Sequence, residues 1–358
     1  MGRPKKEVQE EQPETFKMSF VDRVCSEVEK EYGENLISSA EEITKCQKII
    51  IPSCPTIDIL TSGGFEEGSW VGITGAEKLG KTTLALTIAA NAQKLGKTVY
   101  FGAVECRLEK KSLEGIKGLD INPDKFRYIG QREGQVLTSK DHLSAYLTIL
   151  KNHPGCVLII DNISSLLSQS VQDKGVGTQD RGAGNKPISQ FLDLAAPIVA
   201  ANKSLVIGIT RLISNTSGWG MSLLEKTSNA WKYQRDYVLW AKKRKIIFAG
   251  QSKKPVGQSV TWTCLNSKLG PPGMVGRAFL RFGVGFDKLN DLIAYGVAAK
   301  IIQKGGAWYE FEGEKFQGEE KLYWGLSEKQ DLVDKLEKQI YAYTDLYELL
   351  DSGEEKEE

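Results

Sequence analysis

The sequence is poor in the residues that build metal sites. Its 358 residues include only two histidines, His142 and His153, and six scattered cysteines without a CxxC pair. No set of these residues has the spacing of a zinc site. Cys156, in the apolar run CVLIID, is typical of a small buried side chain. The pattern fits a reducing, cytosol-like compartment and a protein without a structural metal.

Long apolar runs are also missing. Nothing approaches the roughly 18 consecutive apolar residues that a membrane-spanning helix needs. The first residues, MGRPKKEVQEEQPE, have no apolar stretch after their basic residues, which argues against a signal peptide. We therefore expect a cytoplasmic protein with no membrane partner.

An excess of positive charge is lacking as well. The 47 Lys and Arg residues nearly balance 46 Asp and Glu residues, so the net charge gives no support for nucleic-acid binding. Residues 242–245 are nevertheless Lys-Lys-Arg-Lys, whereas the tail at 348–358 is acidic. Any DNA site must therefore be local. The tail could compete with DNA for basic surfaces, or it could be a solubilising end.

The chain changes character near residue 49. Residues 1–15 have the composition of a disordered lead. In the next segment, 16–48, apolar residues recur at helical spacing from Phe16 to Tyr32 and predict an amphipathic helix. This helix could pack within its own chain or dock on a neighbouring subunit.

From Ile49 onward, strands and helices alternate, which predicts an α/β core at 49–286 with a mainly parallel sheet and helices on both faces. A small α/β unit at 287–347 follows it. Strands are expected at 49–51, 70–73, 98–104, 157–160 and 204–210, antiparallel strands at 237–241, 245–249 and 259–266, and helices at 81–95, 139–152, 188–202 and 328–347.

A phosphate-binding loop is the strongest motif. Residues 75–82, GAEKLGKT, fit GxxxxGK[ST] between an apolar strand and a helix. The glycines let successive N–H groups face phosphate oxygens, and the helix N-terminus adds positive charge. A chance match in a glycine-rich turn is the alternative. We expect ATP and Mg²⁺ here, with Lys81 on the β- and γ-phosphates and Thr82 on the metal; the predicted nucleotide-binding residues are Gly75, Ala76, Glu77, Lys78, Leu79, Gly80, Lys81, Thr82 and Thr83.

Two acidic residues follow predicted strands. Asp161 ends the apolar strand 157–160, where a carboxylate can contact the Mg²⁺ shell, although alone it could equally cap a helix. Glu105 follows the strand 98–104 and could orient or deprotonate the attacking water. From its spacing alone, Glu105 is as well explained as a solvated surface residue.

The order of these motifs resembles the RecA family of homologous-recombination proteins, which includes bacterial RecA and phage UvsX-like recombinases. Strand-end Thr210-Arg211 follows the loop, Glu105 and Asp161 in the family's order. Residues 228–233 (SNAWKY), 266–272 (NSKLGPP) and 306–309 (GAWY) resemble further family segments. The resemblance covers roughly Ile49 to Tyr343 and implies a RecA-like P-loop NTPase core and a small C-terminal domain. It also implies that the N-terminal segment 16–48, with its helix, serves oligomerisation.

The resemblance also implies roles in ATP hydrolysis. Glu105 matches the family's catalytic carboxylate, and Lys81 is the catalytic lysine of the loop. Glu109 falls where the family has an acid near adenine. Lys268 matches a catalytic lysine that reaches the ATP of the adjacent subunit, like an arginine finger. Arg211 stands at the position that couples ATP to the DNA-binding loops.

Two glycine-rich loops, 173–182 and roughly 212–228, would hold DNA according to the resemblance, although on composition alone they are mobile surface connections. Such loops can fold on a strand, and an aromatic side chain can stack on a base. The DNA-binding residues implied are Arg181, Lys186, Ser189, Trp219 and Asn229.

Several positions depart from the family pattern. Arg211 replaces a glutamine that senses the γ-phosphate, and Asn266 replaces the first of two paired lysines. Ser112 stands where an aromatic residue would stack on adenine, and Asp193 where an arginine would contact phosphate. These departures put the strength of ATP–DNA coupling in doubt.

The resemblance predicts a DNA-dependent ATPase that forms a homo-oligomeric filament on single-stranded DNA and pairs it with a homologous duplex. Single-strand-binding or mediator proteins are possible partners. A paralogue that regulates or loads a recombinase without exchanging strands is the alternative. A hexameric helicase fits less well, because it has no place for the small C-terminal domain.

Overall fold

The computed structural model describes residues 19–34, 36–45, 48–105, 108–131, 133, 136–166, 185–215, 223–248 and 254–342. The predicted lead and acidic tail lie outside these residues. The chain divides into two compact units, 1–48 and 49–358. Among the described residues, no helix is both long and apolar enough to cross a bilayer.

The first unit contains α1 (Phe20–Tyr32) and α2 (Ala40–Lys45). Helix α1 begins at a capping box, in which the Ser19 hydroxyl accepts from the Asp22 N–H and the Asp22 carboxylate accepts from the Ser19 N–H. None of its residues is buried, and Phe20, Val21 and Tyr32 are exposed. The predicted helix is therefore present from Phe20 onward, while Phe16 lies outside the described residues.

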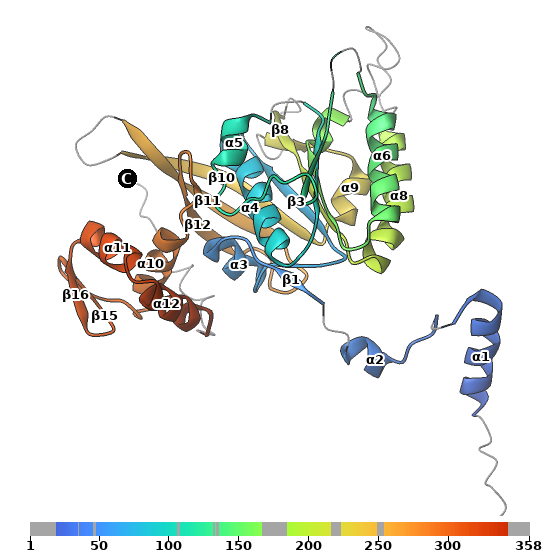
Figure 1. The fold of residues 1–358 in the computed structure, drawn as a ribbon, viewed down its shortest axis with the longest axis horizontal. Helices are drawn as coiled ribbons and strands as arrows, with labels where there is room; N and C mark the ends of the chain where they lie inside the picture. The colour runs from blue at the N-terminus through green and yellow to red at the C-terminus, as the bar shows by residue number, and fades with distance from the viewer. Residues whose placement is uncertain are drawn as a thin grey trace, which may run out of the picture. The chain divides into compact units, whose positions relative to one another are not determined.

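A nine-stranded sheet forms the centre of the second unit (Figure 1), in the order β13-β12-β11-β10-β3-β7-β6-β4-β5. Strands β10, β3, β7, β6, β4 and β5 run parallel to one another, which confirms the mainly parallel sheet. The strands are β3 (Trp70–Gly75), β4 (Val99–Ala103), β5 (Phe126–Ile129), β6 (Val157–Asp161), β7 (Leu205–Ile209), β10 (Tyr237–Phe248), β11 (Pro255–Asn266), β12 (Val275–Arg281) and β13 (Gly285–Phe286).

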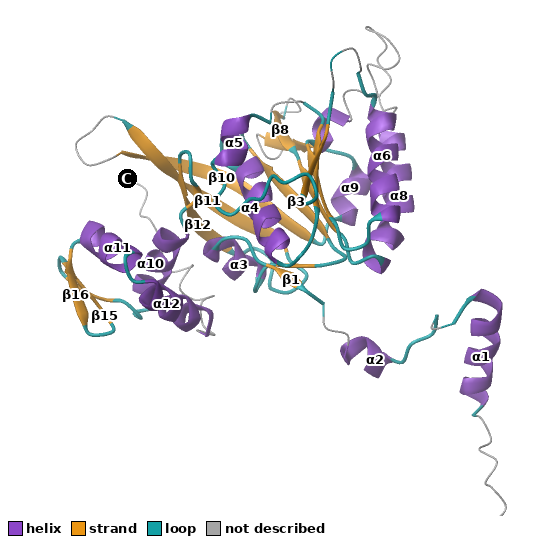
Figure 2. Ribbon diagram, viewed as in Figure 1, coloured by secondary structure: helices purple, strands orange, loops and turns teal. Residues whose placement is uncertain are grey.

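Helices cover both faces of this sheet (Figure 2). Helix α4 (Lys81–Lys94) lies on one face of the sheet. Its apolar residues pack in one cluster with side chains from alternate positions of the strands, including Trp262 of β11. Helices α6 (Ser139–Asn152), α8 (Asn185–Ala201) and α9 (Asn229–Gln234) cover the other face, around Trp70 and Trp231. The strands contribute to both clusters because successive side chains point to opposite faces. The expected layers are confirmed.

The sequence prediction for β10 was wrong. Strands at 237–241 and 245–249 were both expected to be antiparallel, but one strand, Tyr237–Phe248, pairs parallel to β3 and antiparallel to β11. The two expected strands were separated within the basic run 242–245. In the structure its residues are exposed on the strand, and the register with β11 shifts between Ala241 and Arg244. A bulge of this kind absorbs extra residues without ending the strand.

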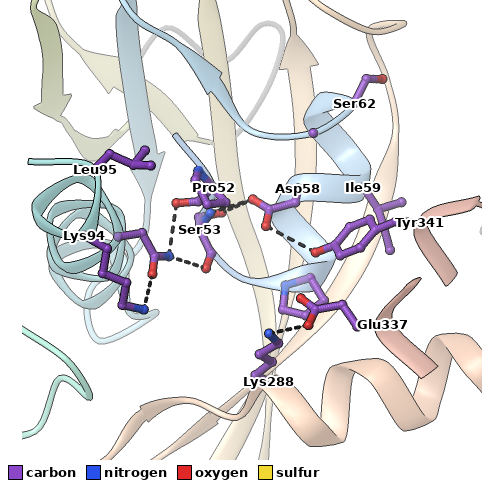
Figure 3. A pocket seen from close by; sticks show the side chains of 13 residues that line it. Pro52, Ser53, Asp58, Ile59, Ser62, Lys94, Leu95, Lys288, Glu337 and Tyr341 are labelled. Atoms are coloured by element: carbon purple, nitrogen blue, oxygen red, sulfur yellow. Dashed lines mark hydrogen bonds and ion pairs between the residues drawn. The ribbon is translucent and has the colours of Figure 1, made fainter. Parts of the chain in front are cut away.

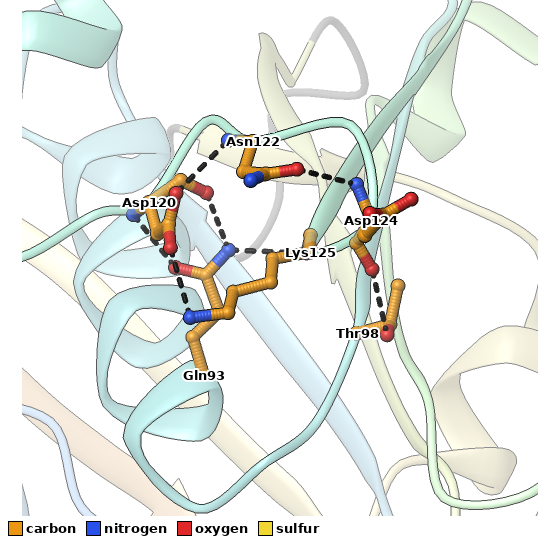
Figure 4. A network of polar contacts seen from close by, with 6 residues as sticks. All are labelled: Gln93, Thr98, Asp120, Asn122, Asp124 and Lys125. Atoms are coloured by element: carbon orange, nitrogen blue, oxygen red, sulfur yellow. Dashed lines mark hydrogen bonds and ion pairs between the residues drawn. The ribbon is translucent and has the colours of Figure 1, made fainter.

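Several short elements were not predicted. They include α3 (Pro55–Thr61), α5 (Lys110–Glu114), the strand β2 (Phe65–Glu66), and the hairpin β8 (Arg211–Ser214) and β9 (Leu223–Lys226). Strand β2 pairs with β1 (Ile50–Ile51), which confirms the strand expected at 49–51. Gln93 of α4 fixes the turn before β5 (Figure 4): its amide nitrogen donates to the carbonyls of Asp120 and Lys125 at 2.8 and 3.1 Å. This contact holds the edge strand against the core.

The C-terminal elements form a third apolar cluster, which includes Ile59 of α3. Helix α12 confirms the predicted terminal helix up to Ala342. The elements are α10 (Lys288–Ala298), β14 (Gln303–Gly305), β15 (Trp308–Phe311), β16 (Glu314–Gln317), α11 (Glu319–Ser327) and α12 (Gln330–Ala342).

Two buried carboxyl groups lie where α3 meets the C-terminal elements. Asp58 accepts from the N–H and hydroxyl of Ser53 at 2.7 and 2.8 Å and from the Tyr341 hydroxyl at 3.3 Å, beside a cavity of about 890 Å³ (Figure 3). Asp291 accepts from the Thr56 hydroxyl and the Phe279 N–H. Burial raises the pKa of each carboxyl from 3.8 to about 7.

Because Asp58 and Asp291 are buried where α3 meets the C-terminal elements, we expect the folded protein to become more stable as the pH falls. A folded-state pKa above the unfolded value means that protonation favours folding, so stability rises from pH 8 toward pH 4 and is lost as pH rises through about 7. Asp58→Asn keeps the acceptor toward Ser53 and removes the charge. We expect it to stabilise the protein at pH 8 by about 1–3 kcal/mol and far less at pH 5. Calorimetric melting at both pH values measures this.

Asp124→Asn is the matched control, because Asp124 is a highly exposed side chain. Its effect on melting should be small at both pH values. Equal stabilisation by Asp58→Asn at pH 5 and pH 8 would contradict a neutral buried carboxyl at the junction.

Candidate nucleotide-binding site

The predicted phosphate loop joins β3 to α4. Its backbone needs glycine at two places. A Cβ on Gly75 would lie 2.5 Å from the carbonyl oxygen of Ala241, and Gly80 has φ +78° at the helix N-cap. Only a residue without a side chain fits either position without strain. The loop can therefore present its N–H groups at the start of α4, as phosphate binding requires.

Lys81 lies across this loop. Its ammonium donates to the carbonyl oxygen of Ala76 at 2.6 Å. Burial lowers the pKa of Lys81, while the nearby carboxylates of Asp161 and Glu77 act in the opposite direction. A partly desolvated cation at this place is suited to bind a phosphate, which would restore the charge balance.

Thr82 and Asp161 meet where the sheet and α4 converge. The Thr82 hydroxyl donates to Asp161 Oδ2 at 2.7 Å, and Asp161 is the last residue of β6. A hydroxyl and a carboxylate are hard oxygen ligands of the kind that Mg²⁺ takes, together with water and phosphate oxygens. The donor set present therefore fits the predicted metal.

Glu105 follows β4 at the same edge of the sheet. Its Oε1 accepts from Asn162 Nδ2 at 2.8 Å and from the Ser165 hydroxyl, and its Oε2 forms an ion pair with Arg211. Asn162 and Ser165 lie within four residues of the end of β6, and Arg211 begins β8, two residues after β7 ends at Ile209. The carboxyl ends of neighbouring parallel strands meet at one edge, which is why these side chains lie together.

A cavity of about 410 Å³ unites these groups. Glu109 and Leu79 do not line it: Glu109 is exposed at the N-cap of α5, and the Leu79 side chain is buried in the core. Leu108 and Ser112, which lie near Glu109 in the sequence, line the cavity instead. The predicted residues that line it are Gly75, Ala76, Glu77, Lys78, Gly80, Lys81, Thr82, Thr83, Glu105, Asp161 and Arg211.

Lys268 lies at the opposite end of the strands, beside the start of β3. It forms an ion pair with Glu66 at 2.9 Å and lies 3.4 Å from the Ser69 hydroxyl, both of which precede β3. The phosphate loop follows the other end of β3. Lys268 is thus not brought to the cavity of its own chain.

The residues expected to bind DNA fall into two groups. Arg181 and Trp219 lie outside the described residues. Lys186 and Ser189 lie in the first turns of α8, and Asn229 is the first residue of α9; Lys186 and Asn229 are exposed and Ser189 is half-buried. None of these three lines the nucleotide cavity.

A polar network ties the hairpin β8–β9 to the cavity edge. Glu225 Oε1 accepts from the Thr210 hydroxyl at 2.5 Å and from Arg235 at 2.6 Å. The Ser164 hydroxyl accepts from the Arg211 N–H at 2.9 Å and donates to the Lys226 carbonyl at 2.7 Å. Sequence analysis named Thr210 and Arg211 but missed Ser164, Glu225 and Arg235, because these residues meet the cavity edge only through the fold. Only the position of Ser164 and Ser165 just after the Asp161 strand could have drawn attention to them.

Gln258 of β11 was also missed. Its buried side chain donates from Nε2 to the carbonyl oxygen of Lys78, at 3.0 Å, in the phosphate loop. Because the peptide unit is planar and trans, the N–H of Leu79 points in the opposite direction. Gln258 thus fixes the orientation of one loop peptide from a neighbouring strand.

Removing this contact should weaken nucleotide binding. We expect Gln258→Ala to raise the Kd for a fluorescent ADP analogue roughly three- to tenfold, because a hydrogen bond of this kind contributes about 0.5–1.5 kcal/mol. Titration by fluorescence measures the change. Gln93→Ala is the control, since it removes another buried amide, at the far end of α4 from the phosphate loop. An equal loss of affinity in both variants would contradict the assignment.

Comparisons with known proteins agree with this geometry. The RecA N-terminal domain family matches residues 19–287, and the RecA C-terminal domain family matches residues 290–345. Over 331 residues, which cover 91% of this chain and 93% of the relative, the sequence is 28% identical to "Protein RecA" of Campylobacter fetus subsp. fetus. It is 26% identical to "Protein RecA" of Oleidesulfovibrio alaskensis over 355 residues, covering 96% and 97% of the two chains. The chain belongs to the RecA family.

Proposed function

We propose that this protein is an ATP-dependent recombinase that forms filaments on single-stranded DNA in the cytoplasm and promotes homologous pairing and strand exchange. One observation carries the proposal. The phosphate loop, Asp161 and Glu105 converge on a cavity whose rim continues into the β8–β9 hairpin. The same edge of the sheet can therefore bind ATP and position a DNA-binding loop.

ATP hydrolysis would use groups that are already in place. The loop N–H groups and Lys81 bind the phosphates, and Thr82 with Asp161 would hold Mg²⁺, which neutralises phosphate charge when bound. Glu105 accepts a proton from the attacking water as its oxygen bonds to the terminal phosphorus. The bond from that phosphorus to the bridging oxygen breaks, and ADP and phosphate leave.

DNA would be held by the segments on either side of the hairpin network. Residues 216–222, which contain Trp219, connect β8 to β9, and Lys186 and Ser189 begin the helix that follows the loop with Arg181. Backbone contacts and base stacking carry little sequence information, so we expect no preference for base sequence. ATP can favour DNA binding only by binding the DNA-competent state more tightly than the other state.

Lys268 would act on a neighbouring subunit. It lies at the edge of the sheet away from its own cavity and is exposed, so a head-to-tail arrangement could bring it to the next ATP. The exposed apolar face of α1, with Phe20, Val21 and Val24, is suited to dock on another copy of the chain. Single-strand-binding and mediator proteins are further candidate partners.

Binding to fluorescent single-stranded DNA tests the proposal, measured by anisotropy with ATP, ADP or no nucleotide. We expect cooperative binding that ATP strengthens roughly tenfold or more, since nucleotide must shift a two-state equilibrium. Lys81→Ala should lose this stimulation while it keeps its melting temperature. Lys243→Ala, which changes an exposed lysine outside the cavity, is the charge-matched control for ATP stimulation. Binding that is indifferent to nucleotide would contradict the proposal.

A mixing experiment tests the shared active site. Glu105→Gln and Lys268→Ala should each abolish DNA-stimulated ATPase activity when alone. A random equal mixture should recover about a quarter of the wild-type rate, because about one interface in four then carries both intact groups. Steady-state ATPase assays at a fixed total protein concentration measure this. No recovery above the two separate variants would contradict action of Lys268 on a neighbour.

A non-exchanging RecA paralogue is the second candidate. The ion pair between Arg211 and Glu105 favours it, because the guanidinium is bound to the carboxylate that would have to accept the proton of the attacking water. Such a paralogue would bind ATP and partner recombinase but would not convert a homologous duplex into exchanged strands. A strand-exchange assay with circular single-stranded DNA and linear duplex separates the two functions.

A further inference from the structure

We propose that Arg211 is a positioning residue that holds Glu105 inactive until a nucleoside triphosphate draws the arginine away. The inference rests on the proposed function, in which Glu105 accepts the proton of the attacking water. It concerns what keeps that carboxylate from acting in the absence of a terminal phosphate.

Donors occupy both oxygens of the Glu105 carboxylate. Oε1 receives the amide of Asn162 at 2.8 Å and the hydroxyl of Ser165, and Oε2 receives the guanidinium of Arg211. The Glu105 side chain is only 16% exposed, so water has little access to it. A guanidinium bound to a carboxylate also makes uptake of a proton by that carboxylate less favourable. In this arrangement Glu105 is poorly suited to act as a base.

Arg211 is placed to exchange one anion for another. It lines the same cavity as Lys81 and Thr82, where the terminal phosphate of a bound triphosphate would lie. A guanidinium binds phosphate oxygens as well as carboxylate oxygens, through paired N–H donors. A triphosphate adds a group with more negative charge than one carboxylate, whereas ADP adds nothing at that position.

The exchange needs only a side-chain movement. The main chain at Arg211 is held by its N–H donating to the Ser164 hydroxyl at 2.9 Å, and Ser164 in turn donates to Lys226 across the hairpin. Glu105 keeps its contacts with Asn162 and Ser165 when Arg211 leaves, so the released Oε2 is the oxygen that accepts the proton. The side chain of Arg211 thus reports the terminal phosphate to Glu105.

A double-mutant cycle on nucleotide affinity tests this without requiring hydrolysis. Glu105→Gln removes the charge that competes for Arg211, so we expect a non-hydrolysable ATP analogue to bind roughly tenfold more tightly, while the Kd for ADP stays within about twofold. Arg211→Gln should weaken analogue binding roughly tenfold and leave ADP binding unchanged. In the double variant the gain from Glu105→Gln should disappear.

Two further variants make the test specific. Arg211→Lys keeps the charge and should retain part of the preference for the analogue over ADP. Arg127→Gln, at an exposed arginine of β5, should change neither affinity. Additive effects of Glu105→Gln and Arg211→Gln on analogue binding, or equal changes for ADP and the analogue, would overturn the proposal. Failure of the recombinase function would leave these nucleotide affinities unaffected, so the two failures are distinguishable.

Discussion

The structure depends on one constraint: parallel strands bring their carboxyl ends to a single edge of the sheet. The strands β3, β6 and β7 are buried along most of their length, so polar groups accumulate where they end. The phosphate loop, Asp161 and Thr210 with Arg211 lie at these three ends, and Glu105 follows β4 beside them. A helix N-terminus at the same edge makes it a site for anions.

Strand β11 connects the two edges of the sheet. At one end Gln258 holds the carbonyl of Lys78 in the phosphate loop, and beyond the other end lies Lys268. If neighbouring subunits share active sites as we propose, β11 contacts the phosphate loop of its own subunit and leads directly to Lys268, which would reach the ATP of the next subunit. A shift of β11 would therefore move both Gln258 at the phosphate loop and Lys268, because packed elements move as rigid units.

Much of this could be predicted from the sequence, for physical reasons. GAEKLGKT and the apolar run ending at Asp161 are local signals, because spacing and burial determine what they form. The long strand β10 was misjudged since four consecutive charges resemble a turn, although an exposed strand tolerates them. The donors around Glu105 could not be predicted, because Asn162, Ser165 and Arg211 meet it only through the fold. Arg211 was recognised as a departure, but its partner was not.

The central claim is that one edge of the sheet links nucleotide to DNA, and such linkage must be reciprocal. The decisive measurement is the Kd of a non-hydrolysable ATP analogue with and without saturating single-stranded DNA, beside the Kd of DNA with and without saturating analogue. We predict that both constants change by the same factor, and that ADP produces a much smaller change. An affinity for the analogue that DNA leaves unchanged would contradict the account.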